Sequence, residues 1–149
     1  MRRYCERRDL SRRYTYRPGA YVILPKGGHI LLTHQAEPIP EVQLPGGGID
    51  PGEAVIPALH REVFEETGWR VSNLRRLGAY RRFTYMPEYD LWAEKIAHIY
   101  RATPMRRLGP PSEDGHTALW MRPEIAVEAL ASDGDRAMLV RFLDGEFGP

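Results

Sequence analysis

The sequence predicts a mixed α/β fold in which a mixed sheet is packed between helices. Short apolar runs bounded by glycine and proline come first, one segment of helical periodicity interrupts them, and two helical segments end the chain. In the strand expected at residues 91–102, apolar side chains occupy both faces, so we expect the sheet to be covered on both sides. The length of 149 residues suits one domain with a core of its own.

Short strands and a hairpin turn open the fold. Residues 20–24 and 29–33 are apolar runs, and the Lys-Gly-Gly sequence at 26–28 between them predicts a hairpin turn. A third strand is expected at residues 42–44. The Pro-Gly-Gly-Gly sequence at 45–48 follows it, and this composition predicts a backbone that adopts positive φ or approaches a ligand closely.

The next segment changes from strand-like to helical periodicity. Val55, Leu59 and Val63 recur every four residues, as the buried stripe of an amphipathic helix does. Pro57 falls near the first turn, where proline is tolerated. Gly68 follows the last polar turn and suits the left-handed position that ends many helices.

The remainder of the chain predicts two longer strands and two helices. Strands are expected at residues 77–86 and 91–102, followed by a loop over 103–115 that is rich in glycine and proline. A last strand is expected at 117–121. Helices are then expected at 123–131 and 135–143.

The formal net charge of +1 conceals a basic N-terminus. Residues 1–17 hold seven arginines against Glu6 and Asp9, a balance of +5, so the remaining residues sum to −4. We expect residues 1–16 to form a basic leader, solvated or at a strand edge, and residues 17–149 to form the domain. The leader lacks helical apolar spacing and has too few tyrosines for a base-stacking platform. Its composition therefore does not favour nucleic acid as a partner, although it does not exclude it.

Cysteine usage and hydropathy exclude other classes of protein. Cys5 is the only cysteine, so neither an internal disulfide scaffold nor a cysteine zinc cluster is compatible with the sequence. No apolar run approaches the ~18 residues that a membrane helix needs. The N-terminal arginines have no apolar stretch behind them, unlike those of a signal peptide. We expect a cytoplasmic protein with no membrane partner.

Three glutamates on the expected middle helix point to a metal. Glu62, Glu65 and Glu66 stand at i, i+3 and i+4, which places them on one helix face. Like charges at this spacing repel, although Arg61 offsets part of the repulsion at Glu65. Hard divalent cations such as Mg²⁺ prefer oxygen ligands and make such a triad favourable. A solvated acidic face explains the triad alone equally well.

The sequence around these glutamates resembles, without a departure, the signature of the Nudix hydrolase family. The residues that carry the resemblance are Gly47, Glu53, Arg61, Glu62, Val63, Glu65, Glu66, Gly68 and Trp69. The flanks at residues 16–24, 44–46 and 119–124 also resemble this family, so the resemblance extends from about residue 16 to the end of the chain.

This resemblance implies the α/β/α sandwich of Nudix proteins, with a mixed central sheet, and an enzyme that hydrolyses a phosphoanhydride bond. Family members use Mg²⁺ or Mn²⁺ and water to cleave a nucleoside diphosphate linked to another moiety. ADP-ribose, dinucleoside polyphosphates, nucleotide sugars and nucleoside triphosphates are such nucleotide-type small molecules. Homodimers are common in the family, so a second copy of the chain is an expected partner.

The resemblance also implies roles for individual residues. Glu65 and Glu66 correspond to the main metal ligands, and the carbonyl of Gly47 completes the set. Glu62 corresponds to a further ligand or to the general base, and these alternatives stay open. Arg61 holds the glutamates in orientation.

Three further groups of residues complete the expected site. Glu53 supports the cluster or coordinates a second ion. Glu113, in the loop before the last strand, is a candidate for the base or an extra ligand, with a solvated loop as the plain alternative. Arg81 is a candidate for holding phosphate, and Phe83 and Tyr85 are candidates for stacking on a base; burial in the core explains them as well.

The sequence leaves the substrate and two other functions open. In some subfamilies a tyrosine or a proline after the signature indicates dinucleoside polyphosphates or ADP-ribose respectively, and here Tyr85 and Pro87 supply both cues. An RNA 5′-end pyrophosphohydrolase would suit the basic leader. A non-catalytic nucleotide sensor is the alternative from another class, but such a sensor has no need of three intact glutamates. Isomerase chemistry on diphosphate esters ranks lower, because the chain is short and the signature unmodified.

Overall fold

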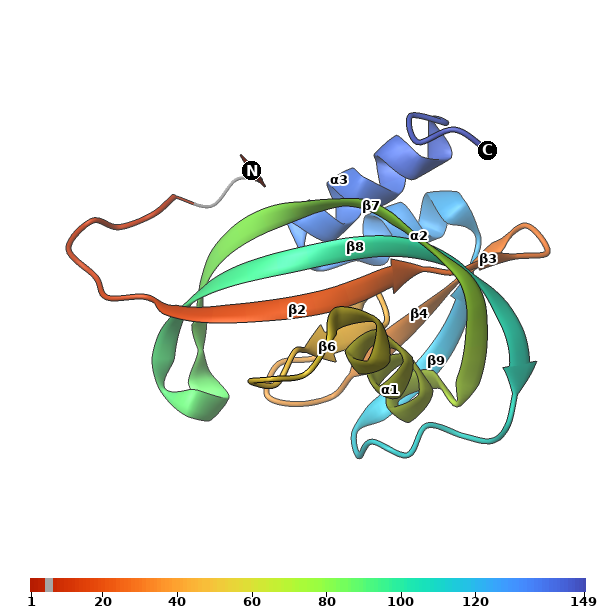
Figure 1. Ribbon diagram of the computed structural model, residues 1–149, viewed down its shortest axis with the longest axis horizontal. Coiled ribbons are helices and arrows are strands. Elements are labelled where there is room, and N and C mark those ends of the chain that lie inside the picture. Colours follow the sequence, from red (N-terminus) through yellow and green to blue (C-terminus); the bar gives the residue numbers. More distant parts are fainter. Residues whose placement is uncertain (5–6) are drawn as a thin grey trace.

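The computed structural model describes residues 1–4 and 7–149 (Figure 1). Cys5, on which the exclusion of disulfides and cysteine zinc clusters rests, lies outside the described residues, as does Glu6. None of the described helices is both long and apolar enough to cross a membrane.

The strands form two sheets. The larger sheet has the order β1 (Arg2–Arg3), β7 (Trp69–Met86), β8 (Leu91–Arg107), β2 (Thr15–Ile23) and β6 (Gly46–Gly48). Strand β2 is parallel to β8, whereas β7 is antiparallel to β8 and β6 is antiparallel to β2, so the sheet is mixed, as predicted. In the second sheet, β4 (His29–Gln35) pairs with β3 (Pro25–Lys26), β5 (Glu41–Gln43) and β9 (His116–Met121).

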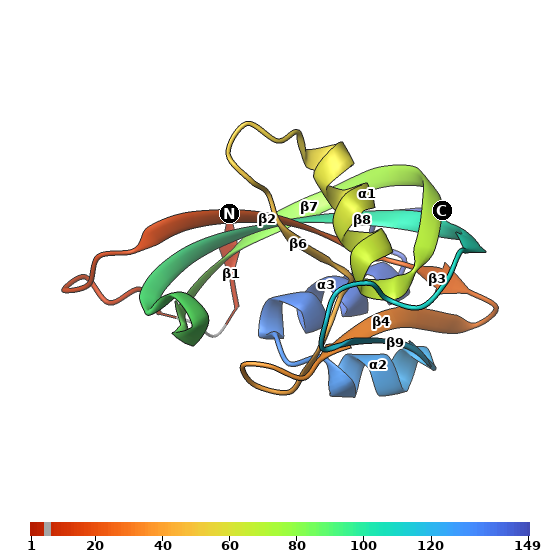
Figure 2. The ribbon, with the colours of Figure 1, turned by 90° about the horizontal axis from the view of Figure 1, so that it is seen from below.

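Helices cover the sheets from two sides. Figure 2 shows α1 (Val55–Thr67) on one side of the larger sheet and α3 (Asp133–Leu143) on the other, with α2 (Pro123–Ala129) beside β4 and β9. A short 3₁₀ helix, η1 (Pro87–Tyr89), joins β7 to β8. This arrangement confirms the predicted mixed α/β architecture.

Alternation along the strands supplies two separate cores. Val22 packs with Leu59 and Val63 of α1, whereas the next residue, Ile23, packs with Leu139 of α3 on the opposite side. Successive side chains of a strand point to opposite faces, so one short apolar run fills both cores. The expectation of apolar residues on both faces is met in β8, where Ala97 lies in one core and Tyr100 in the other.

Several local predictions are confirmed. Gly27 and Gly28 have φ of 58° and 77° and form the two-residue turn between β3 and β4. Helix α1 ends at Thr67, and Gly68 adopts the left-handed conformation with φ of 76°. The last helix, α3, begins at Asp133 rather than at residue 135, because Ser132 caps it by accepting a hydrogen bond from the backbone N–H of Asp135.

The predicted bounds of the long strands were wrong. Strand β7 begins at Trp69 rather than residue 77, and β8 runs on to Arg107 through the segment expected to be a loop. The added residues of β7 are largely polar and exposed, and register shifts interrupt its pairing with β8, so no simple alternation marks them. Pro104 is tolerated because that part of β8 pairs only with β7 in the described sheet.

The described part of the N-terminal segment contacts the larger sheet. Strand β1 pairs in parallel with β7 at Tyr80 and Arg81. The ring of Tyr4 packs edge-on against Tyr80, with centroids 5.7 Å apart. The guanidinium of Arg12 lies 3.7 Å from the ring centroid of Trp92.

Candidate functional site

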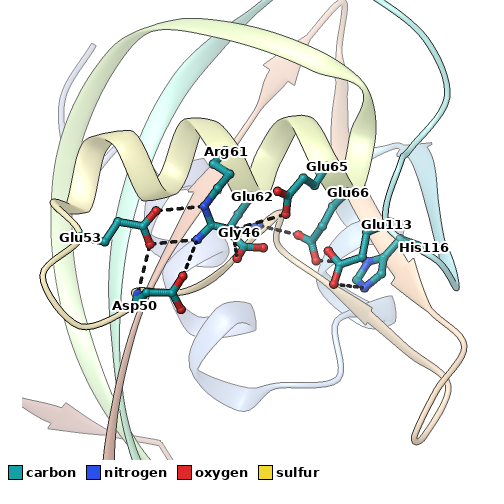
Figure 3. Close-up of polar contacts among 9 residues, drawn as sticks. All are labelled: Gly46, Asp50, Glu53, Arg61, Glu62, Glu65, Glu66, Glu113 and His116. Atoms are coloured by element: carbon teal, nitrogen blue, oxygen red, sulfur yellow. Dashed lines mark hydrogen bonds and ion pairs between the residues drawn. The ribbon is translucent and has the colours of Figure 1, made fainter.

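Helix α1 places Glu62 and Glu66 in the lining of a cleft, with Glu65 beside them (Figure 3). Glu62, Glu65 and Glu66 point toward a common region, and their side chains are 15%, 37% and 5% exposed. The buried stripe of α1 packs on the sheet, which holds the backbone of this helix rigidly. The spacing of the glutamates therefore becomes a fixed geometry.

Strand β6 passes close to two of these carboxylates. The backbone N–H of Gly46 donates a hydrogen bond to Oε1 of Glu66 at 2.8 Å. A Cβ added at Gly47 would lie 2.5 Å from the carboxyl carbon of Glu62, and one added at Gly46 would lie 2.1 Å from the carbonyl oxygen of Ala20. The close approach predicted for this glycine sequence is thus made to the protein's own carboxylates and backbone.

Arg61 joins the glutamates into one network. Its guanidinium donates two hydrogen bonds of 2.9 Å to the carboxylate of Glu53, one of 2.8 Å to Oε1 of Glu62 and one of 3.4 Å to Oε2 of Glu65. The two hydrogen bonds from Arg61 are the main cause that lowers the pKa of Glu53. The planar guanidinium holds both oxygens of the Glu53 carboxylate and, at the same time, one oxygen of Glu62.

A distant loop brings Glu113 to the same place. The N–H groups of Ser112 and Glu113 both donate to the carbonyl oxygen of Glu65, at 2.8 and 3.0 Å. The N–H of Leu108 donates to the carbonyl oxygen of Gly68 at 2.9 Å. The loop thus satisfies carbonyl groups that a helix end leaves unpaired.

His116 also lies in the cluster, although the sequence analysis did not single it out. Its Nδ1 lies 3.1 Å from Oε2 of Glu66 and 3.1 Å from Oγ1 of Thr33. Its Nε2 lies 3.8 Å from Oε1 of Glu113 (Figure 3). No motif marks this histidine; its only signal is its position three residues after Glu113, at the start of β9.

The cluster carries negative charge that the protein compensates only in part. Burial raises the pKa of Glu66 well above its ordinary value, and the charges of Glu113, Glu62 and Glu65 add to this rise. Burial likewise raises the pKa of Glu62, against the hydrogen bond from Arg61. A carboxyl group buried among like charges either keeps its proton or is neutralised by a cation.

The donor set fits a divalent cation. Ligand atoms of Glu62, Glu65 and Glu113 lie within 4.8 Å of one another, and so do those of Glu66, Glu113 and His116. Five carboxylate or imidazole side chains therefore surround two overlapping positions. Carboxylate oxygens are the preferred ligands of Mg²⁺, and Mn²⁺ accepts the added imidazole as well.

A cleft of about 920 Å³ extends from the glutamates between the two sheets. Both sheets line it, and a cleft of this size accommodates a nucleotide. Of the predicted site residues, those that the structure brings together around its acidic end are Gly47, Glu53, Arg61, Glu62, Glu65, Glu66 and Glu113.

The predicted substrate residues on β7 are placed differently. Tyr85 lines the cleft, but Arg81 and Phe83 do not. Arg81 instead makes an ion pair of 3.3 Å with Glu94, and Phe83 is buried with its ring 4.9 Å from that of Tyr14. Arg82 and Thr84, which alternate with Arg81 and Phe83 along β7, line the cleft in their place. Tyr85 lies next to the end of β7, where the strand leads into η1.

A family model described as the NUDIX domain matches residues 15–142. The chain belongs to the NUDIX family. The match extends from β2 to α3 and so contains the whole glutamate network and the cleft of this NUDIX protein.

Curated relatives and solved structures agree with this membership. A Bacillus subtilis (strain 168) protein, named as a candidate 8-oxo-dGTP diphosphatase, is 35% identical over 81 residues, 54% of each chain. A Streptomyces rubellomurinus (strain ATCC 31215) protein, named CMP-5′-(N-acetyl-N-hydroxy-3-aminopropyl)phosphonate hydrolase, is 31% identical over 122 residues, 77% of this chain and 56% of the relative. The chain thus spans about half the length of the curated relatives it matches.

The fold is that of solved NUDIX structures. A NUDIX hydrolase from Nitrosomonas europaea superposes with a TM-score of 0.73 at 16% identity, over 91% of this chain and 93% of that chain. At this level of identity the likeness concerns the fold alone.

Proposed function

We propose that this NUDIX protein is a Mg²⁺- or Mn²⁺-dependent pyrophosphohydrolase that cleaves a nucleoside diphosphate linked to another moiety. The observation that carries the proposal is the meeting of Glu62, Glu65 and Glu66 with Glu113 at one end of the cleft. The names of both curated relatives, a diphosphatase and a hydrolase of a CMP conjugate, support this class of reaction.

The proposed reaction is hydrolysis of a phosphoanhydride. Water attacks one phosphorus atom, a new P–O bond forms, the bridging P–O bond breaks, and a proton of the water passes to a carboxylate. The products are a nucleoside monophosphate and a second phosphorylated fragment, or pyrophosphate when the substrate is a triphosphate. A divalent cation, when bound, neutralises the diphosphate oxygens and lowers the pKa of water at the site.

The residues around the glutamates keep them in a productive arrangement. Arg61 and Glu53 form a rigid pair that fixes the carboxylate of Glu62, and the N–H of Gly46 fixes that of Glu66. We assign metal binding to Glu62, Glu65 and Glu66 and a positioning role to Arg61 and Glu53. Preorganised carboxylates need no rearrangement when substrate binds.

Glu113 has two roles open to it, as a metal ligand or as the acceptor of the proton from water, and Glu113→Gln separates them. Loss of a ligand lowers the apparent affinity for Mg²⁺, so a high concentration of Mg²⁺ restores the rate. Loss of the proton acceptor leaves kcat low at saturating Mg²⁺ and removes the acidic limb of its pH profile.

The experiment that tests the proposed function is product analysis by mass spectrometry after incubation with Mg²⁺. The panel contains ADP-ribose, NADH, nucleotide sugars, diadenosine polyphosphates, normal and oxidised nucleoside triphosphates, and a 5′-triphosphorylated RNA. Glu65→Gln is the test variant, and Glu128→Gln, at an exposed position of α2, is its matched control. We expect cleavage of at least one panel member by the wild type and Glu128→Gln, and a loss of at least about 100-fold in Glu65→Gln.

Two results would overturn the proposal. Equal turnover by wild type and Glu65→Gln would show that the cluster is not catalytic. Binding of a panel member without cleavage, in the presence of Mg²⁺ and then of Mn²⁺, would instead identify a nucleotide sensor.

A further inference from the structure

Three cationic side chains form a row across the larger sheet. Arg17 of β2 is in register with Lys95 of β8, and Lys95 is in register with Arg82 of β7. All three line the cleft. Side chains of directly paired residues lie on one face of a sheet, about 5 Å apart, and like charges in this relation destabilise it. We call these three residues the cationic row.

Lys95 is the centre of the row, and it is half-buried in the wall of the cleft. Within residues 1–4 and 7–149, its ammonium group makes neither a hydrogen bond nor an ion pair. Burial lowers the pKa of Lys95, and the charge of Arg82 adds to this effect. Asp135, Glu88 and Glu41 act on it from beyond ion-pair distance and oppose the shift less strongly. A partly desolvated cation without a partner costs free energy, and an anionic ligand that pairs with it removes this cost.

Arg17 also has N–H groups that can donate hydrogen bonds to a ligand. Its guanidinium lies over the ring of Tyr89, 4.6 Å from the centroid, and Tyr89 lines the same cleft. In the described part of the chain, no acceptor or carboxylate pairs with this guanidinium. Stacking on an aromatic face restrains the guanidinium while its N–H edge remains available.

The cationic row lies further along the cleft than the glutamates. Ala20, three residues after Arg17, is paired with Gly47 of β6, and a Cβ at Gly47 would meet the carboxylate of Glu62. Three residues of strand span about 10 Å. The cleft therefore holds a cluster of carboxylates that suits metal and diphosphate, and, about one sugar unit beyond it, a group of cations.

We propose that the cationic row binds an oxyanion, a phosphomonoester or a carboxylate, on the part of the nucleotide substrate remote from the bond that is cleaved. This inference rests on the proposed function and narrows its substrate class. The enzyme prefers nucleoside diphosphate derivatives that carry a second anionic group on the attached moiety. The oxyanion neutralises Lys95 and accepts hydrogen bonds from Arg17, the two cations of the row for which the described residues supply no ion-pair partner.

A binding measurement without metal tests the row independently of catalysis. Ligand-detected NMR titrations in EDTA compare ribose 5-phosphate, glucuronate and ribose as probes. We expect the wild type to bind at least one of the two anions at least about tenfold more tightly than ribose. Lys95→Met removes this preference, Lys95→Arg restores it at least in part, and Lys26→Met, at the chain's other lysine, leaves it unchanged. Thermal unfolding verifies that each variant is folded.

Turnover of matched substrates with Mg²⁺ tests the consequence for specificity. UDP-glucuronate is compared with UDP-glucose, and NADPH with NADH, because each pair differs mainly by one anionic group. We expect at least one pair to show a ratio of kcat/KM of at least about ten in favour of the anionic member. Lys95→Met brings this ratio close to one, chiefly through KM.

The outcomes separate this inference from the proposed function. If no nucleotide is cleaved, the proposed function fails, while the NMR titrations still decide whether the row binds anions. If ribose 5-phosphate and glucuronate bind no better than ribose, or if Lys95→Met binds them as the wild type does, the row is not an anion site and the inference is wrong.

Discussion

Glu66 shows how a single residue of the site depends on its surroundings. It is nearly inaccessible to solvent, it accepts the N–H of Gly46, and it faces His116 and the other carboxylates. A carboxylate in this position is costly for the metal-free fold and useful once a cation is present. The burial of Glu66 therefore lowers the stability of the fold in the absence of a cation, a cost that is common at functional sites.

The destabilising burial of the Glu66 carboxylate predicts how the stability of the protein in EDTA depends on pH. Because burial raises the pKa of Glu66, the folded protein holds this proton more tightly than the unfolded chain, and stability falls as pH rises above about 4.5. Glu66→Gln lacks this loss. Its Tm should therefore exceed that of the wild type by a margin that grows between pH 4 and 8, to at least about 2 °C.

Circular dichroism melts of both proteins across this pH range measure the margin. Glu128→Gln, at an exposed position of α2, serves as the control and should show no growing margin. A margin for Glu66→Gln that stays constant or shrinks with pH would contradict the prediction.

Arg61 is predicted to act through the carboxylates that it holds. Lysine keeps the charge but lacks the planar fork that donates to both oxygens of Glu53 and also to Glu62. In Arg61→Lys we expect kcat to fall about 10–100-fold, since misplaced supports of metal ligands typically cost this much. Steady-state kinetics should show KM within about threefold of the wild type. A loss confined to KM would indicate instead that Arg61 contacts substrate.

At the scale of elements, the site depends on how closely β6 lies against α1. The strand is made of three glycines, and its pairing with β2 sets its distance from the helix. The end of α1 holds the loop of Glu113 in a similar way, through carbonyl groups of Glu65 and Gly68. Strand β6 and the loop that carries Glu113 thus determine where the carboxylates meet beside α1.

Two neighbouring glycines of β6 provide a matched test of this packing. A Cβ at Gly47 would lie 2.5 Å from the carboxyl carbon of Glu62, whereas one at Gly48 would meet no described atom within 4 Å. Gly47→Ala should therefore displace Glu62 and lower kcat/KM at least about tenfold. Gly48→Ala should stay within about twofold in the same assay. Similar losses in both variants would mean that the flexibility of the strand, rather than contact with Glu62, is what matters.

At the scale of the whole molecule, the cleft arises because the strands divide into two sheets. One sheet supplies the cationic row, the other closes the opposite wall, and α1 places the carboxylates at one end. The N-terminal segment lies along the larger sheet, where β1 pairs with β7 and Tyr4 packs on Tyr80. We propose that residues 1–16 are an appended segment and that residues 17–149 form the NUDIX domain.

Deletion of residues 2–13 tests this division. The shortened chain keeps β2 complete and should fold, because both buried cores are formed mainly by later residues. Loss of the Tyr4 contact and of β1 should cost about 1–2 kcal/mol, or roughly 2–8 °C in Tm. Turnover of a substrate found in the product analysis should remain within about twofold. Failure to fold, or a loss of activity far beyond this, would assign the N-terminal segment to the domain itself.

The residues alone determined much of this protein. The four-residue spacing of α1, the Gly-Gly turn and Gly68 are local features, and local periodicity and backbone sterics suffice to predict them. The glutamates and Arg61 were found because their spacing on one helix is visible in the chain. They lie together in the structure, where Arg61 donates hydrogen bonds to Glu62 and Glu65.

Tertiary structure alone decided which distant residues join them. His116 reaches Glu66 because β9 pairs with β4, and Lys95 meets Arg17 and Arg82 because of strand register. The orientation of β7 in the sheet determines that Arg82 faces the cleft and that Arg81 and Phe83 do not. A shift of one residue reverses every side chain of a strand, and the polar, irregular start of β7 gives no local signal of that phase. Helix geometry can thus be predicted from neighbouring residues, whereas the walls of the cleft depend on pairing between segments far apart in the chain.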